Sequence, residues 1–177
     1  MGQTALLLSL TKSNFDQLAA DPASFDYHQV ALASEEFNKT FEGLRFVLSK
    51  AKPEEADLLA HLFEPSLFVG EEIDYAEIDW DDLPPDMPLE GTAVYYHDPA
   101  TVQALSTHLA TITDQNFRQA FDPVELNRSG IYPEVWNRKE GENQAFNERH
   151  LISEFHQLQH FMATASAGNN YCICYID

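Results

Sequence analysis

Two histidines near the end of the sequence have a spacing that could bind a metal ion. His156 and His160 are four residues apart in the string HQLQH, and residues at this spacing share one face of a helix, as in a two-histidine metal half-site. A zinc protease needs Glu where Gln157 stands, so the general base of that chemistry is missing. Because Phe155 and Leu158 would face inward, we interpret both histidines as the border of a buried stripe. They remain weak candidate metal ligands, and no cofactor is predicted.

Three glutamates are the residues best suited to acid–base chemistry. Glu71 and Glu72 follow Gly70, and in the fold they could meet Asp98 or Glu134. Two carboxyl groups can act as general acid and base when they lie roughly 5–10 Å apart. The sequence contains no glycine-rich phosphate loop, no Gly-x-Ser-x-Gly turn and no Cys–His pattern. Glu71, Glu72 and Glu134 are therefore weak catalytic candidates, and a non-catalytic protein is the favoured interpretation.

Several aromatic residues could line a binding pocket. Tyr132 and Trp136 could face Tyr95 and Tyr96, and such side chains combine a large apolar body with a polar atom. The competing interpretation is that rings at this density belong to the core. We retain Tyr95, Tyr132 and Trp136 as candidate binding residues.

The stretch DYAEIDWDD, residues 74–82, has the acidic density of a calcium-binding loop. In the alignment that places Asp81 and Glu90 at the third and twelfth positions, Leu83 and Pro84 fall at the fifth and sixth. An EF-hand requires an oxygen ligand and a glycine at those two positions. The stretch is therefore interpreted as a solvated acidic loop.

The net charge of −19 is distributed unevenly along the chain. Residues 53–117 contain 15 Asp and Glu and no Lys or Arg. Such a surface repels phosphate backbones, so nucleic acid is disfavoured as a ligand, while basic proteins and divalent cations are attracted. The first functional hypothesis is a binding module for a basic protein partner, such as a toxin or nucleic-acid enzyme that the chain neutralises. The alternatives are a small-molecule hydrolase that uses carboxylates near an aromatic pocket, and acidity that serves only solubility.

The sequence also bears on the compartment. No apolar run approaches the roughly 20 residues that span a bilayer, and MGQTALLLSL lacks the basic residues and cleavage site of a signal peptide. Cys172 and Cys174 would share one face of a strand with Cα atoms roughly 6.5–7 Å apart, at or beyond the disulfide limit. We predict a buried pair of reduced thiols in a cytoplasmic protein without membrane association.

The elements that must position these residues follow from hydrophobic pattern. Thr4–Leu10 is an apolar run typical of a buried strand. Residues 34–50 are predicted to be a helix, because apolar side chains recur there at helical spacing (Phe37, Phe41, Leu44, Leu48). Pro53 begins a short helix that ends at Glu64-Pro65.

The second half of the chain continues in the same way. Residues 67–73 are a turn or short strand, residues 92–96 a strand, and Asp98 with Pro99 begins a helix. Residues 117–136 are predicted to be the end of one helix, a short second helix and a Tyr-Pro exit. The longest helix is predicted over residues 142–167.

The last segment, YCICYID, is apolar on both alternating faces, which indicates a central strand covered on both sides. A few strands among many helices favour an α/β or α+β fold. We predict one domain over residues 1–177, a three-layer sandwich with a small sheet between helices.

Several of these segments, in this order, resemble the YfbM-like family of bacterial domains of unknown function. The resemblance extends nearly end to end, and FDP followed by IYPEVW is its most specific part; the matching segments are residues 39–48, 70–73, 95–105 and 121–136. It implies a three-layer α/β sandwich and no established activity. Relatives often carry histidines or Trp in the segment matching residues 41–45, where this chain has Phe41, Glu42 and Arg45. A role that depends on those histidines is therefore not expected here.

Overall fold

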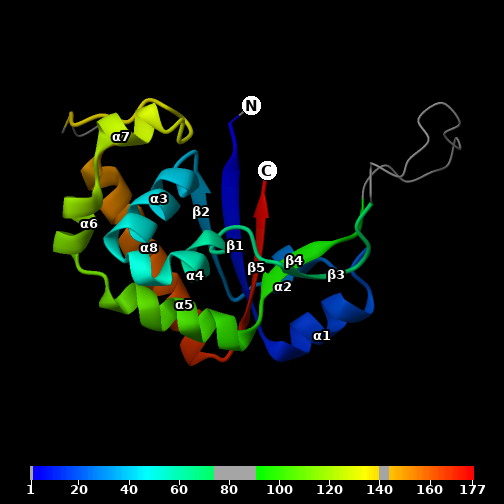
Figure 1. The fold of residues 1–177 in the computed structure, drawn as a ribbon. Helices are drawn as coiled ribbons and strands as arrows, with labels where there is room; N and C mark the ends of the chain where they lie inside the picture. The colour runs from blue at the N-terminus through cyan, green and yellow to red at the C-terminus, as the bar shows by residue number, and fades with distance from the viewer. Residues whose placement is uncertain (1, 74–90, 140–143) are drawn as a thin grey trace, which may run out of the picture.

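The computed structural model describes residues 2–73, 91–139 and 144–177. Its strands form one antiparallel sheet with the order β2–β1–β5–β4–β3 (Figure 1). The strands of the described residues are β1 (Thr4–Leu10), β2 (Ala33–Asn38), β3 (Leu67–Val69), β4 (Val94–His97) and β5 (Tyr171–Ile176). β5 is the central strand, as its two apolar faces predict.

One face of the sheet is covered by most of the helices and carries the main core (Figure 1). Leu7, Cys172 and Cys174 point from the sheet into this core. The helices on this side, after a 3₁₀ turn at Pro53–Glu55 that precedes α4, are α3 (Phe41–Ala51), α4 (Ala56–Ala60), α5 (Pro99–Thr111), α6 (Asp114–Ala120), α7 (Pro123–Arg128) and α8 (Glu148–Ala167).

The opposite face carries a thinner layer made by α1 (Lys12–Ala20) and α2 (Tyr27–Val30). Phe15 and Leu18 of α1 form a second core cluster with Leu8, Leu10 and Ile173 of the sheet. Helices on both faces confirm the predicted three-layer sandwich. Because every strand pair among the described residues is antiparallel, the fold is of the α+β class.

The predicted helix over residues 34–50 is wrong in its first part. Ala33–Asn38 is the edge strand β2, which pairs with β1 in the register Ala5↔Phe37, and α3 begins only at Phe41. Phe37 has helical spacing to Phe41, but it enters the core from a strand, and Lys39 has a positive φ of 63° in the turn between the two elements. Alternation of a buried Phe with exposed charge is ordinary for an edge strand.

Residues 117–136 have the predicted order of helix, short helix and Tyr-Pro exit. The Trp136 ring is buried, its Nε1 donates to the carbonyl of Ile131 at 2.8 Å, and it packs against Gly43 of α3. A Cβ atom at Gly43 would lie 2.3 Å from that ring. The glycine therefore lets α3 approach the ring that anchors the α7 exit.

Candidate functional site

The structure separates the three predicted binding aromatics. Trp136 is a core residue, and Tyr132 is held to α3 by its backbone N–H, which donates to the Glu42 carboxylate at 3.1 Å. Tyr95 lies on β4, in the part of the sheet that projects away from α7 (Figure 1). The expected pocket shared by Tyr95, Tyr132 and Trp136 is therefore not formed, because the Trp136 ring fills the space beside Gly43 instead.

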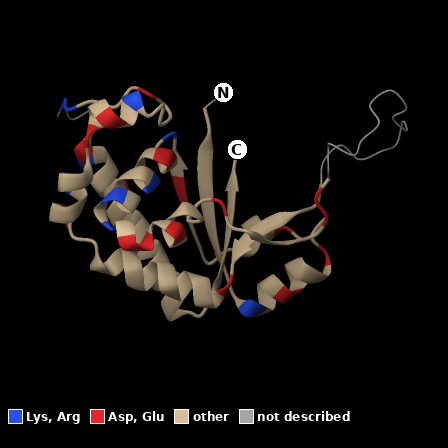
Figure 2. Ribbon diagram, viewed as in Figure 1, with Lys and Arg blue, Asp and Glu red and all other residues tan. Residues whose placement is uncertain are grey.

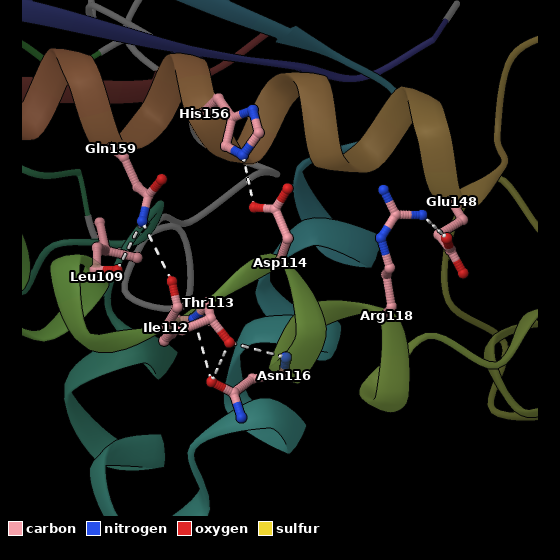
Figure 3. A network of polar contacts seen from close by, with 9 residues as sticks. All are labelled: Leu109, Ile112, Thr113, Asp114, Asn116, Arg118, Glu148, His156 and Gln159. Carbon is pink, nitrogen blue, oxygen red and sulfur yellow. Dashed lines mark hydrogen bonds and ion pairs between the residues drawn. The ribbon is translucent and has the colours of Figure 1, made fainter.

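His156 is paired with Asp114 across the contact between α8 and α6, not with His160 (Figure 3). Its Nε2 lies 2.7 Å from Asp114 Oδ1, and on the same contact Arg118 forms an ion pair with Glu148. His160 is exposed. Within the described ranges, no group of three or more His, Cys, Asp and Glu side chains is arranged to hold a metal ion. The visible role of His156 is to join two helices.

The candidate carboxylates are likewise divided. Glu72 accepts a hydrogen bond from the Tyr95 hydroxyl, and Glu71 is its neighbour at the end of β3. Glu134 follows α7, at the other end of the molecule, in a turn with a positive φ of 61° (Figure 1). This placement does not assemble the carboxylate pair of the hydrolase-type hypothesis. The possible calcium loop over residues 74–90 lies outside the described residues.

A cavity lies where β4 and β5 separate. These strands pair only at Tyr96↔Ile173 and His97↔Cys172, whereas β5 stays paired with β1 as far as Ile176. Beyond the last β4–β5 pair there is a cavity of about 360 Å³. We call it the wedge cavity, and its lining residues are Phe63, Glu64, Pro65, Ala93, Tyr95, Cys174, Tyr175 and Ile176.

The β3–β4 ribbon that borders the wedge cavity is fastened at its far end. The N–H groups of Thr92 and Ala93 donate to the carbonyl of Glu71 at 2.9 and 3.1 Å, and the Glu71 N–H donates to the Thr92 hydroxyl at 3.0 Å. Gly70 has φ +93°, and a Cβ atom there would lie 2.3 Å from the Thr92 carbonyl oxygen. Since these bonds and this glycine hold the ribbon together, it diverges from β5 as one unit.

The helices α3 to α8 do not extend over this ribbon (Figure 1). Phe68 and Tyr95 are cross-strand neighbours with ring centroids 5.7 Å apart. Phe68 is 40% exposed and Leu67 is 43% exposed. An open aromatic pair therefore stands beside the wedge cavity, with the Glu72 carboxylate fixed to the Tyr95 hydroxyl.

The polar groups of the wedge cavity are suited to binding. The hydrogen bond to Glu72 raises the pKa of the Tyr95 phenol, and burial raises the pKa of the Cys174 thiol to about 12. That thiol donates to the Phe63 carbonyl at 3.0 Å. At neutral pH both groups are protonated, so neither is a nucleophile or a base. Glu64 is the acidic residue of the lining, and its Oε2 lies 3.1 Å from Nη1 of Arg45.

The sequence identified Tyr95 and Glu72 as candidates but missed Phe63, Glu64 and Pro65. The sequence placed a helix end at Glu64-Pro65, but α4 ends earlier, at Ala60, so these two residues lie outside the helix. The cavity exists because β4 and β5 stop pairing after two residue pairs. These strands are more than 70 residues apart in the sequence, so no local pattern shows where their pairing ends.

Charges are distributed unevenly over the fold (Figure 2). Apart from Lys12, every Lys and Arg lies on or beside β2, α3, α6, α7 and α8. Many are in ion pairs, including Lys50 with Glu125 and Arg118 with Glu148. Lys12 is paired with Asp16 at 2.8 Å. The half built from α1, α2, β3 and β4 therefore has an excess of acid.

Comparisons with known proteins identify a family and a fold. The family model described as domain of unknown function (DUF1877) matches residues 1–175. The crystal structure of YfbM from Escherichia coli, a protein of unknown function, is similar with a TM-score of 0.65 and 18% identity, over 98% of this chain and 99% of that one.

No curated protein matches the chain. Within the part of the chain that the structure describes, none of the helices combines the length and the apolar character needed to cross a bilayer. The near-complete match of the family model confirms the YfbM-like resemblance, and the chain belongs to the family of domains of unknown function DUF1877.

Proposed function

We propose that this chain is a non-catalytic, cytoplasmic binding module whose partner is a protein with a basic surface. The observation that carries the proposal is the uneven distribution of basic residues: the Lys and Arg residues gather on the α3–α8 side, and the strands β3 and β4 have none (Figure 2). In the sequence, the stretch between Ile73 and Gly91 contains seven acidic residues and no basic one. Fields of this kind steer oppositely charged proteins into contact.

The β3–β4 end also offers apolar surface to such a partner. Leu67 and Phe68 are exposed on the edge strand β3, and Glu71 and Glu72 follow directly. Interfaces combine apolar contacts that exclude water with charges at the rim. Covering a basic surface would keep that surface from phosphate backbones, which is the neutralising role we infer.

The test measures binding of a decalysine peptide by titration at low and high salt. The double variant Glu71→Gln/Glu72→Gln is expected to bind about tenfold more weakly than the unmodified protein at low salt, because two carboxylates leave the proposed contact. The matched control is Glu35→Gln/Glu36→Gln, which makes the same change of charge on β2, at the opposite edge of the sheet. The control is expected to retain binding.

Equal weakening in both variants would mean that only net charge matters, and the proposed location would be wrong. Affinity capture from lysate then extends the test. We expect captured proteins to be basic, to elute with salt and to be lost with the Glu71→Gln/Glu72→Gln protein. Captured proteins that are acidic, or that remain bound at high salt to both variants, would overturn the proposal.

A further inference from the structure

We propose that the wedge cavity receives one arginine side chain from an extended segment of the basic partner. This inference rests on the proposed function and adds the pocket and the side chain that it recognises. The cavity of about 360 Å³ lies at the small end of the range for ligand pockets, which is roughly 300–1,000 Å³. A single long side chain fits within this volume.

The walls match the hydrocarbon part of such a side chain. Phe63, Pro65, Ala93 and Ile176 line the cavity with apolar atoms. The methylene stem of Arg or Lys packs on apolar surface while its charged group stays near the opening. An acidic or short polar side chain would leave these walls uncovered.

The polar groups favour a guanidinium as the charged end. Glu64 is the carboxylate in the lining, and it already holds the Arg45 guanidinium on its Oε2 at 3.1 Å. A carboxylate has two oxygens and can accept from a second guanidinium. The Tyr95 ring adds an aromatic group to the lining. A planar guanidinium stacks on the face of such a group and binds a carboxylate through two parallel bonds, whereas an ammonium cannot do both.

The strand geometry favours an extended carrier for this side chain. β5 leaves its pairing with β4 after Ile173 but continues alongside β1 to Ile176. Strand edges that face a gap are places where an extended segment can add main-chain hydrogen bonds. Glu72, fixed to Tyr95, places a further negative charge beside the gap. The partner segment is thus expected to carry Arg between apolar residues of high strand propensity.

The experiment is an NMR titration of the full chain with the capped peptide Gly-Val-Arg-Val-Gly and with the same peptide containing citrulline, a neutral isostere of arginine. We expect the arginine peptide to shift the amide signals of Ala93, Tyr95, Cys174 and Ile176 and to bind at least tenfold more tightly than the citrulline peptide. Ala93→Leu, which fills the cavity, is expected to abolish these shifts. Ala110→Leu adds the same volume at an exposed position of α5 and is expected to change nothing.

Glu64→Gln keeps the shape of the lining and is the variant to test if Ala93→Leu fails to fold. It is expected to weaken binding of the arginine peptide and to leave binding of the citrulline peptide unchanged. The proposed pocket would be wrong if the peptide shifted only the signals of Glu71 and Glu72, or if Ala93→Leu bound the arginine peptide unchanged. The proposed function would still stand in that case if the decalysine peptide kept its preference for the Glu71 and Glu72 site. A loss of site preference in the decalysine test would overturn the proposed function itself. The two failures are therefore distinguishable.

Discussion

At the scale of single residues, Glu154 is a buried carboxyl group that the candidate site does not use. Burial raises its pKa to about 7, and a contact with the Thr40 hydroxyl opposes part of that rise. Its Oε1 lies 3.4 Å from His150 Nε2, while His150 Nδ1 accepts the Phe146 N–H at 3.2 Å. Since Nδ1 accepts, the neutral ring carries its proton on Nε2, directed at Glu154.

Replacement of Glu154 by Gln is expected to stabilise the protein at pH 8 by roughly 3 kcal/mol, from a rise of the pKa from 4.5 to about 7. The folded state holds this proton more tightly than the unfolded state, so this group lowers stability as pH rises from about 4.5 to about 7. Urea unfolding of both proteins from pH 4 to 8 measures the difference.

The difference between the two proteins should be near zero at pH 4 and reach its full size above pH 7. A constant difference across this range would mean that Glu154 ionises as freely when folded as when unfolded. His150 is present in both proteins; burial lowers its pKa, so its own contribution runs in the opposite direction.

At the scale of elements, α5 carries β4 into the helical layer and begins with a defined cap. Asp98 accepts from the Thr101 N–H at 2.7 Å, and Pro99 occupies the first turn. This backbone hydrogen bond, with a second from the Thr101 side chain, lowers the pKa of Asp98. The ionised form is therefore the one that the fold stabilises.

Asp98→Ala is expected to destabilise the protein by about 1 kcal/mol, because an N–H of the first turn loses its partner. Asp98→Asn keeps the acceptor and should cost less. The depressed pKa of Asp98 gives stability that is present above its unfolded value and lost as pH falls through the folded value. Thermal unfolding at pH 7 and pH 3 measures both effects, and an alanine variant as stable as the asparagine variant would contradict the capping role.

The elements that sequence predicted well are those with one dominant local signal. β5 is apolar on both faces, and Asp98-Pro99 combines a cap with a first-turn proline. The error at β2 arose because Phe37 continues a helical stripe into α3, and only tertiary pairing with β1 separates the two elements. Local spacing cannot distinguish these outcomes for a short segment.

The candidate site was less predictable for a related reason. Tyr95 and Glu72 were identified by residue type, but their hydrogen bond depends on the β3–β4 ribbon. Trp136 was identified by the same reasoning and is a core residue, because the absent side chain of Gly43 gives its ring a place to pack. Residue type therefore indicates what a side chain could do, and packing determines whether it is accessible.

At the scale of the whole molecule, the sheet has a firmly paired part and a loosely attached part. β1 is paired along its length with β2 on one side and β5 on the other, whereas β4 meets β5 at Tyr96↔Ile173 and His97↔Cys172 only. Sub-global opening is expected first where few pairs and little buried apolar surface hold an element.

Native-state hydrogen exchange is expected to show this division. Amides of β3 and β4, with the exception of His97 beside its buried pair, should exchange at least tenfold faster than those of β1 and β5. Equal protection across all these strands would mean that the ribbon is as firmly held as the centre. Saturating arginine peptide should slow exchange in β4 if the wedge cavity is its site.

The two ends of the described chain also meet in the sheet: the Thr4 N–H donates to the Asp177 carbonyl at 2.8 Å, and the Asp177 N–H donates to the Thr4 carbonyl at 2.9 Å (Figure 1). The central strand β5 follows the other strands in the sequence, so β1 and β2 are joined to β4 and β3 by an element more than 130 residues further along the chain. Without Tyr171–Ile176, the β1–β2 pair and the β3–β4 pair would share no strand pairing. The six residues of β5 are therefore the element that joins the two parts of the sheet.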